Sequence, residues 1–445
     1  KNIFFLLLTL ISSCSFDNKT GIWGGGKEEK ERISEIEKKQ REVIDTYKVY
    51  SSDQTYAKEI ILTEKISLSK PKNNSSWIMS DLNSQNFLGN IYISGIENIF
   101  LKKKIGKNKF DESNASSSFL IIKNSIILSD DVGTVYKVSN SGKVIWKKNI
   151  YTKAYKRIRK NLVFSIYDNN IYIADNIGFI YSINLDTGKL FWIKNHGVPL
   201  KSNIKIFDRK IYIIDQDNKI LSLNIKDGSK VWEFLSLSSF IKSQNLLSLA
   251  LSKEGDLIFI NSAADLYKFD SQNGRIYWSS NTTKSLLADA TDFFLSSDIT
   301  LTNKEVIFSA NSLFFSYDLM KGSINWESEV SSVGAPIIDG ENIFFVTENG
   351  YFVIMKKGTG KIISSTNILN ILKKEKKRKT KISGFVMGSG KIYSFTKNGY
   401  LIVSSAVSGK TEQFKKIGDE INSKPIICDG KLYILTRNSK IIVFN

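Results

Sequence analysis

Two cysteines and one histidine are the residues of this 445-residue chain with the strongest nucleophilic or metal-binding chemistry. Metal sites and thiol or imidazole catalysis need several such groups close together, usually with carboxylates that orient them. His196 lies in a polar stretch with no cysteine or acidic cluster beside it. We therefore predict no catalytic site, no metal site and no cofactor. We interpret three scattered acids as turn and cap residues: Asp175, Asp215 and Asp270.

Cys14 is the one residue whose sequence neighbours point to a covalent modification. The apolar run at residues 3–11 is too short for a transmembrane helix but fits the core of a secretory signal. Ile11, Ser12, Ser13 and Cys14 resemble a bacterial lipoprotein box. The resemblance implies a signal peptide at residues 1–13 and a lipid on the Cys14 thiol that anchors the protein to the outer membrane at its periplasmic face. The alternative is plain secretion with an incidental Cys14.

The composition changes between Cys14 and the rest of the chain, and we predict a tether at residues 14–72. Residues 24–26 are three glycines, which form a flexible joint. Residues 27–47 are rich in Glu, Lys, Arg and Gln with few apolar positions, a pattern that predicts a solvated or partly docked helix about 30 Å long. The remaining residues, 73–445, are predicted to form one globular domain.

A repeat of about 45 residues runs through that domain. A glycine follows a short polar turn seven times, with spacings of 46, 40, 46, 48, 38 and 49 residues. Alternating strands and turn pairs such as Asn349-Gly350 and Asp429-Gly430 surround each glycine. Short antiparallel strands with this period indicate an all-β protein, a β-propeller. The glycines are Gly142, Gly188, Gly228, Gly274, Gly322, Gly360 and Gly409.

The carboxyl-terminal end of the repeat fixes the predicted number of blades. After Gly409 the chain supplies three more strands, up to residue 444, and no outer strand follows them. An open ring would expose a long apolar edge, which natural sheets avoid. Residues 90–105 can supply the missing strand, so we predict eight blades closed by an amino-terminal strand. Cys428 lies at a strand end and is interpreted as a packing residue.

Tryptophans four residues after the first five glycines resemble the docking motif of the pyrroloquinoline-quinone (PQQ) propeller superfamily. The resemblance implies that each indole packs on the neighbouring blade and that its N–H finds a backbone partner. Ser364 and Gln413 stand at the tryptophan position in repeats six and seven, so their contacts must differ. Quinoprotein dehydrogenases of this superfamily use adjacent cysteines and calcium-ligating acids, and this chain has no Cys-Cys pair. The structural-repeat tryptophans are Trp146, Trp192, Trp232, Trp278 and Trp326.

The lipoprotein box, the tether and the propeller together resemble the BamB family, the PQQ-like lipoproteins of the outer-membrane β-barrel assembly machinery. The resemblance implies a non-catalytic scaffold that binds a periplasmic POTRA domain of the BamA-like barrel-inserting subunit, as a monomer within a larger complex. The matching loops are the two longest inter-blade links, residues 233–245 and 279–298. The residues expected to bind the partner are Phe240, Ile241 and Lys242 in the first link and Asp289 and Asp292 in the second.

The net charge of +19 raises nucleic acid or anionic lipid as partners. Lys, Ile and Asn are abundant throughout the chain, as an AT-rich genome would produce, and we expect no nucleic-acid partner. Only residues 373–381, KKEKKRKTK, form a dense basic cluster, and its plain interpretation is a solvated loop. Two alternatives stay open: a PQQ-dependent quinoprotein-like enzyme, and a periplasmic propeller that binds a ligand or polysaccharide.

Overall fold

Each repeat folds into one four-stranded antiparallel sheet. Three of its strands are apolar, and the fourth mixes apolar with polar residues, as an outer strand that is buried on one side does. In the second repeat the first three strands are almost completely buried, whereas the outermost strand, β9, is half exposed. The structure is a computed structural model. It describes residues 30–36, 38, 56–107, 109–110, 118–236, 246–282, 295–418, 420–421 and 423–445.

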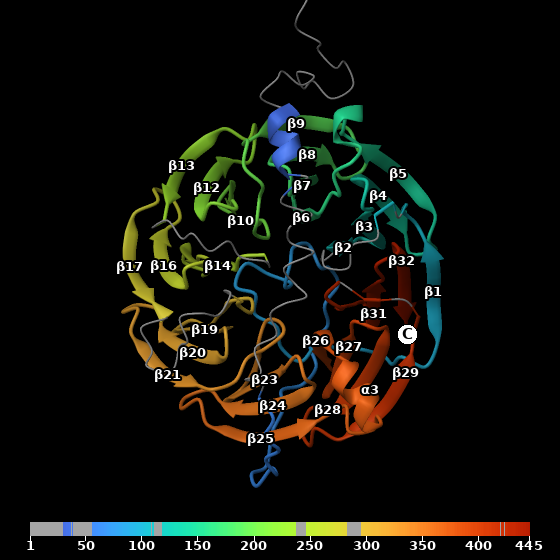
Figure 1. Cartoon of the computed structure of the whole chain (residues 1–445), viewed down its shortest axis with the longest axis vertical. Helices are drawn as coiled ribbons and strands as arrows, with labels where there is room; N and C mark the ends of the chain where they lie inside the picture. Colours follow the sequence, from blue (N-terminus) through green and yellow to red (C-terminus); the bar gives the residue numbers. More distant parts are fainter. Residues whose placement is uncertain are drawn as a thin grey trace, which may run out of the picture.

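Eight such sheets form the blades of a propeller, as predicted (Figure 1). Blades 1 to 4 are β2(Phe119–Ile122), β3(Ser125–Ser129), β4(Thr134–Ser139), β5(Val144–Asn149); β6(Leu162–Tyr167), β7(Asn170–Asp175), β8(Phe179–Asn184), β9(Leu190–Asn195); β10(Lys205–Phe207), β11(Lys210–Ile214), β12(Lys219–Asn224), β13(Lys230–Leu235); and β14(Leu249–Leu251), β15(Asp256–Ile260), β16(Asp265–Asp270), β17(Ile276–Asn281). Blades 5 to 8 are β18(Thr300–Leu301), β19(Glu305–Ala310), β20(Leu313–Asp318), β21(Ile324–Ser328); β22(Ile337–Asp339), β23(Asn342–Val346), β24(Tyr351–Lys356), β25(Ile362–Asn367); β26(Ile382–Gly388), β27(Lys391–Thr396), β28(Tyr400–Ser405), β29(Thr411–Lys416); and β30(Ile426–Cys428), β31(Lys431–Leu435), β32(Lys440–Phe444), β1(Ile99–Lys104).

The strand order gives the ring two different faces. In blades 1 to 7 the chain enters at the innermost strand and leaves at the outermost one, so the links between successive blades lie on one face, which we call the link face. The turns that carry the repeat glycines lie on the opposite face, which we call the turn face. Two short helices belong to links: the 3₁₀ helix η1(Lys153–Tyr155) and α3(Lys374–Lys379). No helix among the described residues is long and apolar enough to cross a membrane.

The repeat tryptophans join each of blades 1 to 5 to the next blade. The indole N–H of Trp232, for example, donates to the Ser271 carbonyl of blade 4 at 2.9 Å. Gly274 must be glycine there, because its φ is +74° and an added Cβ would lie 2.8 Å from the Trp232 ring. The other four indoles donate to the next blade in the same way: Trp146 to Leu185, Trp192 to Ile225, Trp278 to Leu319 and Trp326 to Lys357.

The junction after blade 6 has no tryptophan, and two substitutes replace it. An added Cβ at Gly409 would lie 2.9 Å from Thr366, so this threonine occupies the place of the indole. Residues 56–72, which the sequence assigned to the tether, pack on the propeller instead. Ile60 exchanges two backbone hydrogen bonds of 2.9 Å with Ser365 on the outer strand of blade 6, and Glu64 pairs with Lys356 at 2.8 Å.

The eighth blade is closed by β1, which pairs with β32 in antiparallel register. The prediction of residues 90–105 for this strand was too wide. Only residues 99–104 form it, while Ile91 and Ile93 make parallel bridges to Gly388 and Gly430 near the axis. The strand begins later because the residues before it are bonded to blades 7 and 8 inside the ring.

Residues 74–94 form one complete turn around the inside of the propeller, and we call this segment the axial hoop (Figure 1). It contacts the innermost strand of every blade, or the turn after that strand, through hydrogen bonds of 2.7 to 3.3 Å. The contacts lie near the ends of these strands, so the hoop closes the axis toward the turn face. In chain order they are Asn74 to blade 8, Trp77 to blade 1, Ile78 to blade 2, Ser80 to blade 3, Ser84 to blade 4, Gln85 to blade 5, Leu88 to blade 6, Ile91 to blade 7 and Ser94 to blade 8 again.

Replacing Trp232 by alanine tests the docking role of the indoles. The change removes a hydrogen bond and a stacked contact with Phe269, so we expect the free energy of unfolding to fall by about 3 kcal/mol. Urea unfolding followed by circular dichroism measures it. Gln413→Ala is the matched control, because Gln413 holds the same register position in blade 7 and is exposed. Equal losses in the two variants would contradict the docking role.

Replacing Asn86 by alanine tests the hoop. The Asn86 amide donates to the Leu249 and Ile299 carbonyls at 3.1 and 2.8 Å and is almost completely buried. Because the variant leaves buried carbonyls without donors, we expect a loss of roughly 2–4 kcal/mol in unfolding free energy. Gln85→Ala is the control, since the side chain of Gln85 makes one long contact of 3.5 Å and is partly exposed. A loss below that of the control would contradict the account of the hoop.

Candidate functional site

The two links that were predicted to bind a partner leave neighbouring parts of the link face. The first follows β13 and leads to blade 4, and the second follows β17 and leads to blade 5. The predicted residues themselves, Phe240, Ile241, Lys242, Asp289 and Asp292, lie outside the described residues, as does Cys14. The structure therefore places the ends of the two links and not the predicted contact residues.

Those ends are held by buried polar contacts between blades 3 and 4. The Ser236 hydroxyl, at the start of the first link, donates to the Asn218 carbonyl at 3.1 Å and accepts from the Asn261 amide at 3.1 Å. The Asn218 side chain in turn bonds Ser262 of blade 4. At the start of the second link, the Thr282 hydroxyl donates to the Ala264 carbonyl at 3.0 Å. Both links thus begin from rigid positions, which suits loops that present a binding surface.

A cluster of four charged side chains fills the axis between the hoop and the link face. Lys424, before blade 8, donates to both carboxylate oxygens of Asp81 in the hoop at 2.9 Å and to Asp298, before blade 5, at 2.5 Å. Lys205 of blade 3 donates to the carbonyls of Ser80 and Asn83 at 2.8 Å and to the side chain of Asn86. The cluster therefore ties the hoop to blades 3, 5 and 8.

Burial and pairing shift the pKa values of this cluster in opposite directions. Burial opposes the charge of Lys424, but Asp298 and Asp81 outweigh it, so the pKa of this lysine is raised. Burial also opposes the charge of Asp81, but Lys424 and Lys205 outweigh it and lower its pKa. Burial dominates at the other two groups, so the pKa of Asp298 is raised and that of Lys205 falls to about 8.

The axis does not fit the quinone cofactor that the resemblance to quinoprotein dehydrogenases would imply. The acids nearest the axis, Asp81 and Asp298, are both bonded to the Lys424 ammonium, so they do not form a calcium site. The hoop fills the other end of the axis. Cys428, buried in the inner strand of blade 8, has no second cysteine beside it among the described residues, and burial raises its pKa to about 12. The described residues contain no group of three or more His, Cys, Asp or Glu that could hold a metal ion.

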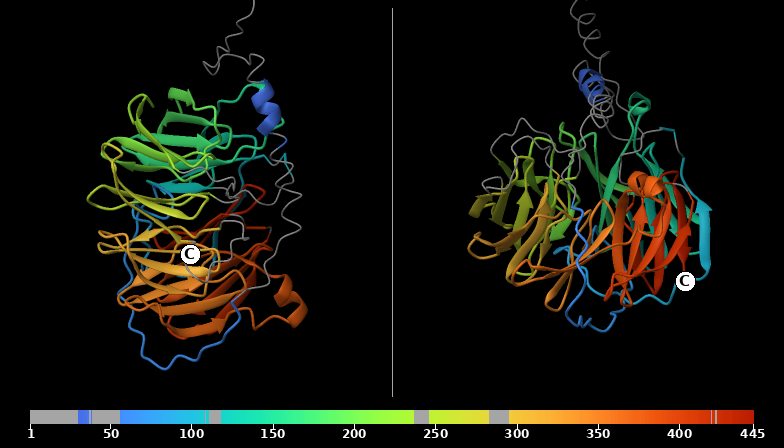
Figure 2. Two further views of the ribbon diagram at one scale, coloured as in Figure 1. Left: turned by 60° about the vertical axis from the view of Figure 1, so that its left-hand side comes forward. Right: turned by 60° about the horizontal axis from the view of Figure 1, so that its bottom comes forward.

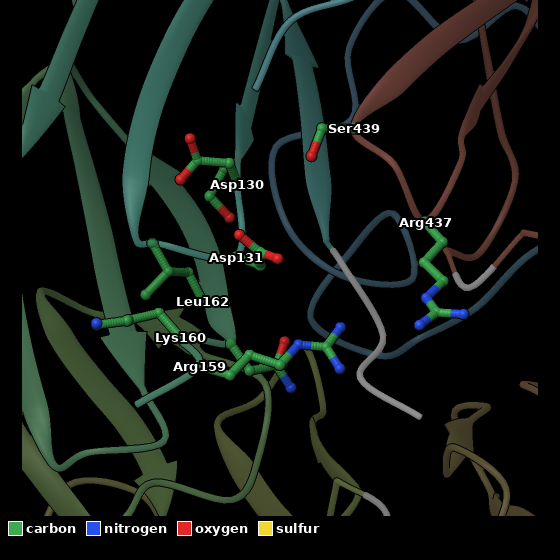
Figure 3. Close-up of a pocket in the computed structure, with 9 residues that line it drawn as sticks. Asp130, Asp131, Arg159, Lys160, Leu162, Arg437 and Ser439 are labelled. Carbon is green, nitrogen blue, oxygen red and sulfur yellow. The ribbon is translucent and has the colours of Figure 1, made fainter. Parts of the chain in front are cut away.

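A small hollow opens on the link face where blades 8, 1 and 2 meet. Figure 3 shows the guanidinium groups of Arg159 and Arg437 extending into it, on the side away from Asp130 and Asp131. Asp130 accepts from the backbone N–H of Thr134 and Lys107, and Asp131 accepts from those of Lys109 and Phe110. These acids therefore hold the chain that follows β1, and the hollow is a structural joint.

The remaining candidate residues have structural contacts of the expected kind. The Asp175 carboxylate accepts from three backbone N–H groups of its turn, at Ile177, Gly178 and Phe179, which is the cap role that the sequence predicted. Burial lowers the pKa of His196, so its imidazole is neutral at pH 7, and its backbone N–H donates to the Gly178 carbonyl at 2.8 Å. The second Asp175 oxygen accepts from the Tyr151 hydroxyl at 2.5 Å, which ties the turn to the link after blade 1.

Comparison with known proteins decides the family. Residues 131–366, slightly more than half of the chain, match the family described as outer membrane protein assembly factor BamB. The chain belongs to the BamB family. No curated protein matches it in sequence.

Solved structures agree on the fold and differ in function. BamB from Moraxella catarrhalis superposes with a TM-score of 0.62 at 13% identity, and the match covers 78% of this chain and 100% of that chain. A quinohemoprotein alcohol dehydrogenase from Comamonas testosteroni gives a TM-score of 0.62 at 10% identity, covering 83% of this chain and 80% of the dehydrogenase. A computationally designed protein, Ika8, gives 0.56 at 11% identity, covering 76% and 99%. At these identities the likeness shows the propeller fold alone.

Sequence reasoning missed the axial cluster and the hoop. The four charged residues of the cluster come from the hoop and three different blades, so no local pattern joins them. Lys205 is the one residue whose position in the sequence could have indicated the cluster. It stands at the start of an inner strand, and a lysine that is buried there needs a partner.

Replacing Lys424 by methionine tests the axial cluster and gives a characteristic pH dependence. Asp81 and Asp298 would lose the cation between them, and we expect a loss of ~2 kcal/mol near pH 8, less than for a fully buried pair because Lys424 is partly exposed. The two carboxylates would then share a raised folded-state pKa. A raised carboxyl pKa means that the folded state binds more protons, so the variant should gain stability as pH falls from 8 toward 5.

The control for this variant is Lys357→Met. Lys357 pairs at 3.7 Å with Glu341, which is largely exposed, so its loss should change the unfolding free energy by less than about 0.5 kcal/mol at every pH. Urea unfolding between pH 5 and 8 measures both variants. A Lys424→Met variant whose deficit stays constant over that range would show that the two acids do not depend on the lysine.

Proposed function

We propose that this protein is a non-catalytic scaffold lipoprotein of the outer-membrane β-barrel assembly machinery. It is anchored through Cys14 at the periplasmic face of the outer membrane and binds a POTRA domain of the barrel-inserting subunit. Membership of the BamB family is the observation that carries the proposal. The axis supports it as well, because charged side chains that bond one another fill the place where related enzymes hold their cofactor.

The proposed binding surface consists of the two links predicted at residues 233–245 and 279–298, whose first three residues still belong to β13 and β17. They leave the same face from neighbouring blades, and buried contacts hold their ends in place. Phe240 and Ile241 would supply an apolar anchor, and Lys242, Asp289 and Asp292 would orient the partner by charge. An apolar anchor with complementary charges at its edge is a common arrangement in protein interfaces.

A pull-down from solubilised outer membranes tests this function. The lipidated full-length chain should recover the barrel-inserting subunit, and Ile241→Glu with Lys242→Glu should reduce recovery at least tenfold. The melting temperature of the variant should match that of the wild type, because the substitutions lie in a link and outside the blades. Immunoblotting of the eluate measures recovery.

A matched variant on the turn face controls for the change in charge and polarity. Lys143→Glu with Ile145→Glu alters one exposed lysine and one exposed isoleucine on blade 1, far from both links in the strand order. Recovery with this variant should stay within twofold of the wild type. If the wild type recovers no barrel-inserting subunit, or if the turn-face variant loses it equally, the proposed function is wrong.

A further inference from the structure

The helix α3 carries a dense positive charge, and no acid among the described residues forms an ion pair with its cations. Residues 373–381 contain seven cations and one acid, a net charge of 7 − 1 = +6. The helix buries none of its residues. Within the described chain, the one acid that pairs with this segment is Glu348, at 3.8 Å from Lys381, and Glu348 is also bonded to Lys397 at 3.2 Å. The six cations at residues 373–379 therefore remain available to an outside partner.

An exposed apolar residue stands beside this charge. Ile371, two residues before the basic segment, is 60% exposed, while the neighbouring Leu372 packs against the core and fixes the position of the link. A basic helix next to an exposed branched aliphatic side chain is typical of surfaces that contact lipid headgroups. Acidic lipids attract lysines that lie within about one Debye length, ~8 Å, of the membrane surface.

A second helix on the same face indicates which way this face is turned. Residues 30–36 are helical, Ile33 and Ile36 are buried in the core cluster of the propeller, and Arg32 donates to the carbonyls of Ile177 and Gly197. Both carbonyls belong to the link face of blade 2. Figure 2 shows this helix and α3 projecting from the same side of the ring.

The position of the docked helix limits the distance between the link face and a lipid on Cys14. Fifteen residues, 15–29, separate Cys14 from the first described helical residue, Lys30. Even a fully extended chain of that length spans at most about 55 Å. A chain anchored at Cys14 therefore joins the propeller at the link face, and this face lies within about 55 Å of the membrane.

We propose that the link face is turned toward the membrane and that α3 binds anionic phospholipid headgroups there. The proposal rests on the lipid anchor in the proposed function, but it adds a second, electrostatic contact between the protein and the bilayer. Two weak membrane signals together give durable attachment where either alone is reversible. The contact also sets an orientation, because α3 and the docked helix lie at different blades of the ring.

Vesicle binding without the lipid anchor isolates this contact. The full-length chain with Cys14→Ser is mixed with phosphatidylethanolamine vesicles that contain or lack phosphatidylglycerol, at an ionic strength of about 0.15 M. We expect binding only to the anionic vesicles. Lys374→Gln, Lys376→Gln, Lys377→Gln and Lys379→Gln together should weaken it at least tenfold, because each lysine near the surface contributes several-fold.

The control removes the same charge from the turn face. Lys143→Gln, Lys189→Gln, Lys226→Gln and Lys410→Gln alter four exposed lysines in the turns of that face, and binding should stay within twofold of the parent. The proposal is overturned if the Cys14→Ser chain does not bind anionic vesicles. It is equally overturned if both lysine variants lose vesicle affinity to the same extent, since net charge alone would then explain binding. It is also overturned if the α3 variant keeps its vesicle affinity and instead loses a co-purifying protein.

The lipidated α3 variant separates this proposal from the proposed function. It should recover the barrel-inserting subunit as well as the wild type does, because α3 shares no residue with the two partner-binding links. Loss of vesicle binding with normal recovery supports the lipid contact at α3. Vesicle binding by a chain that recovers no barrel-inserting subunit would leave the lipid contact standing and contradict the proposed function alone.

Discussion

The hydrogen bonds between the axial hoop and the eight inner strands are the contacts on which the closed ring depends. Seven of the blades present backbone groups toward the axis at the inner strand or at the turn after it, and blade 3 presents the Lys205 ammonium; buried groups of this kind need partners. Residues 74–94 provide them for blade after blade in the order of the ring. The chain then leaves the axis and supplies β1 to the last blade. The same segment thus supplies hydrogen-bond partners at the centre of the ring and continues into β1, the strand that closes the ring.

This use of the axis restricts where function can reside. A propeller offers its axis, its two faces and its rim to ligands, and here the axis holds a hoop and four charged side chains that bond one another or the backbone. Of the surfaces that remain, the link face carries the two long links, the docked helix at residues 30–36 and the basic helix α3. The family relationship and the geometry therefore both support the proposal of a scaffold that binds its partner through loops displayed on a rigid ring.

The repeat could be predicted from the sequence because the residues that produce it lie close together in the chain. A glycine with positive φ, an apolar alternating strand and a tryptophan four residues later occur within a dozen residues, and the structure places them as one unit. The count of eight followed from the unpaired outer edge at the chain's end. The hoop was not readable, because Asn86 bonds residues more than 160 positions away and its polar neighbours resemble an ordinary loop. Likewise, no sequence pattern near Ser364 predicts that the backbone of Ile60 pairs with that of Ser365.

Site-specific photocrosslinking in intact cells tests the central claim, that the link face is the surface that binds the barrel-assembly partner. A photoreactive residue at position 241 should form an adduct with the barrel-inserting subunit, and the same residue at position 145, at the turn-face end of the outermost strand of blade 1, should not. An adduct from position 145 but none from position 241, with both proteins folded and lipidated, would contradict the account.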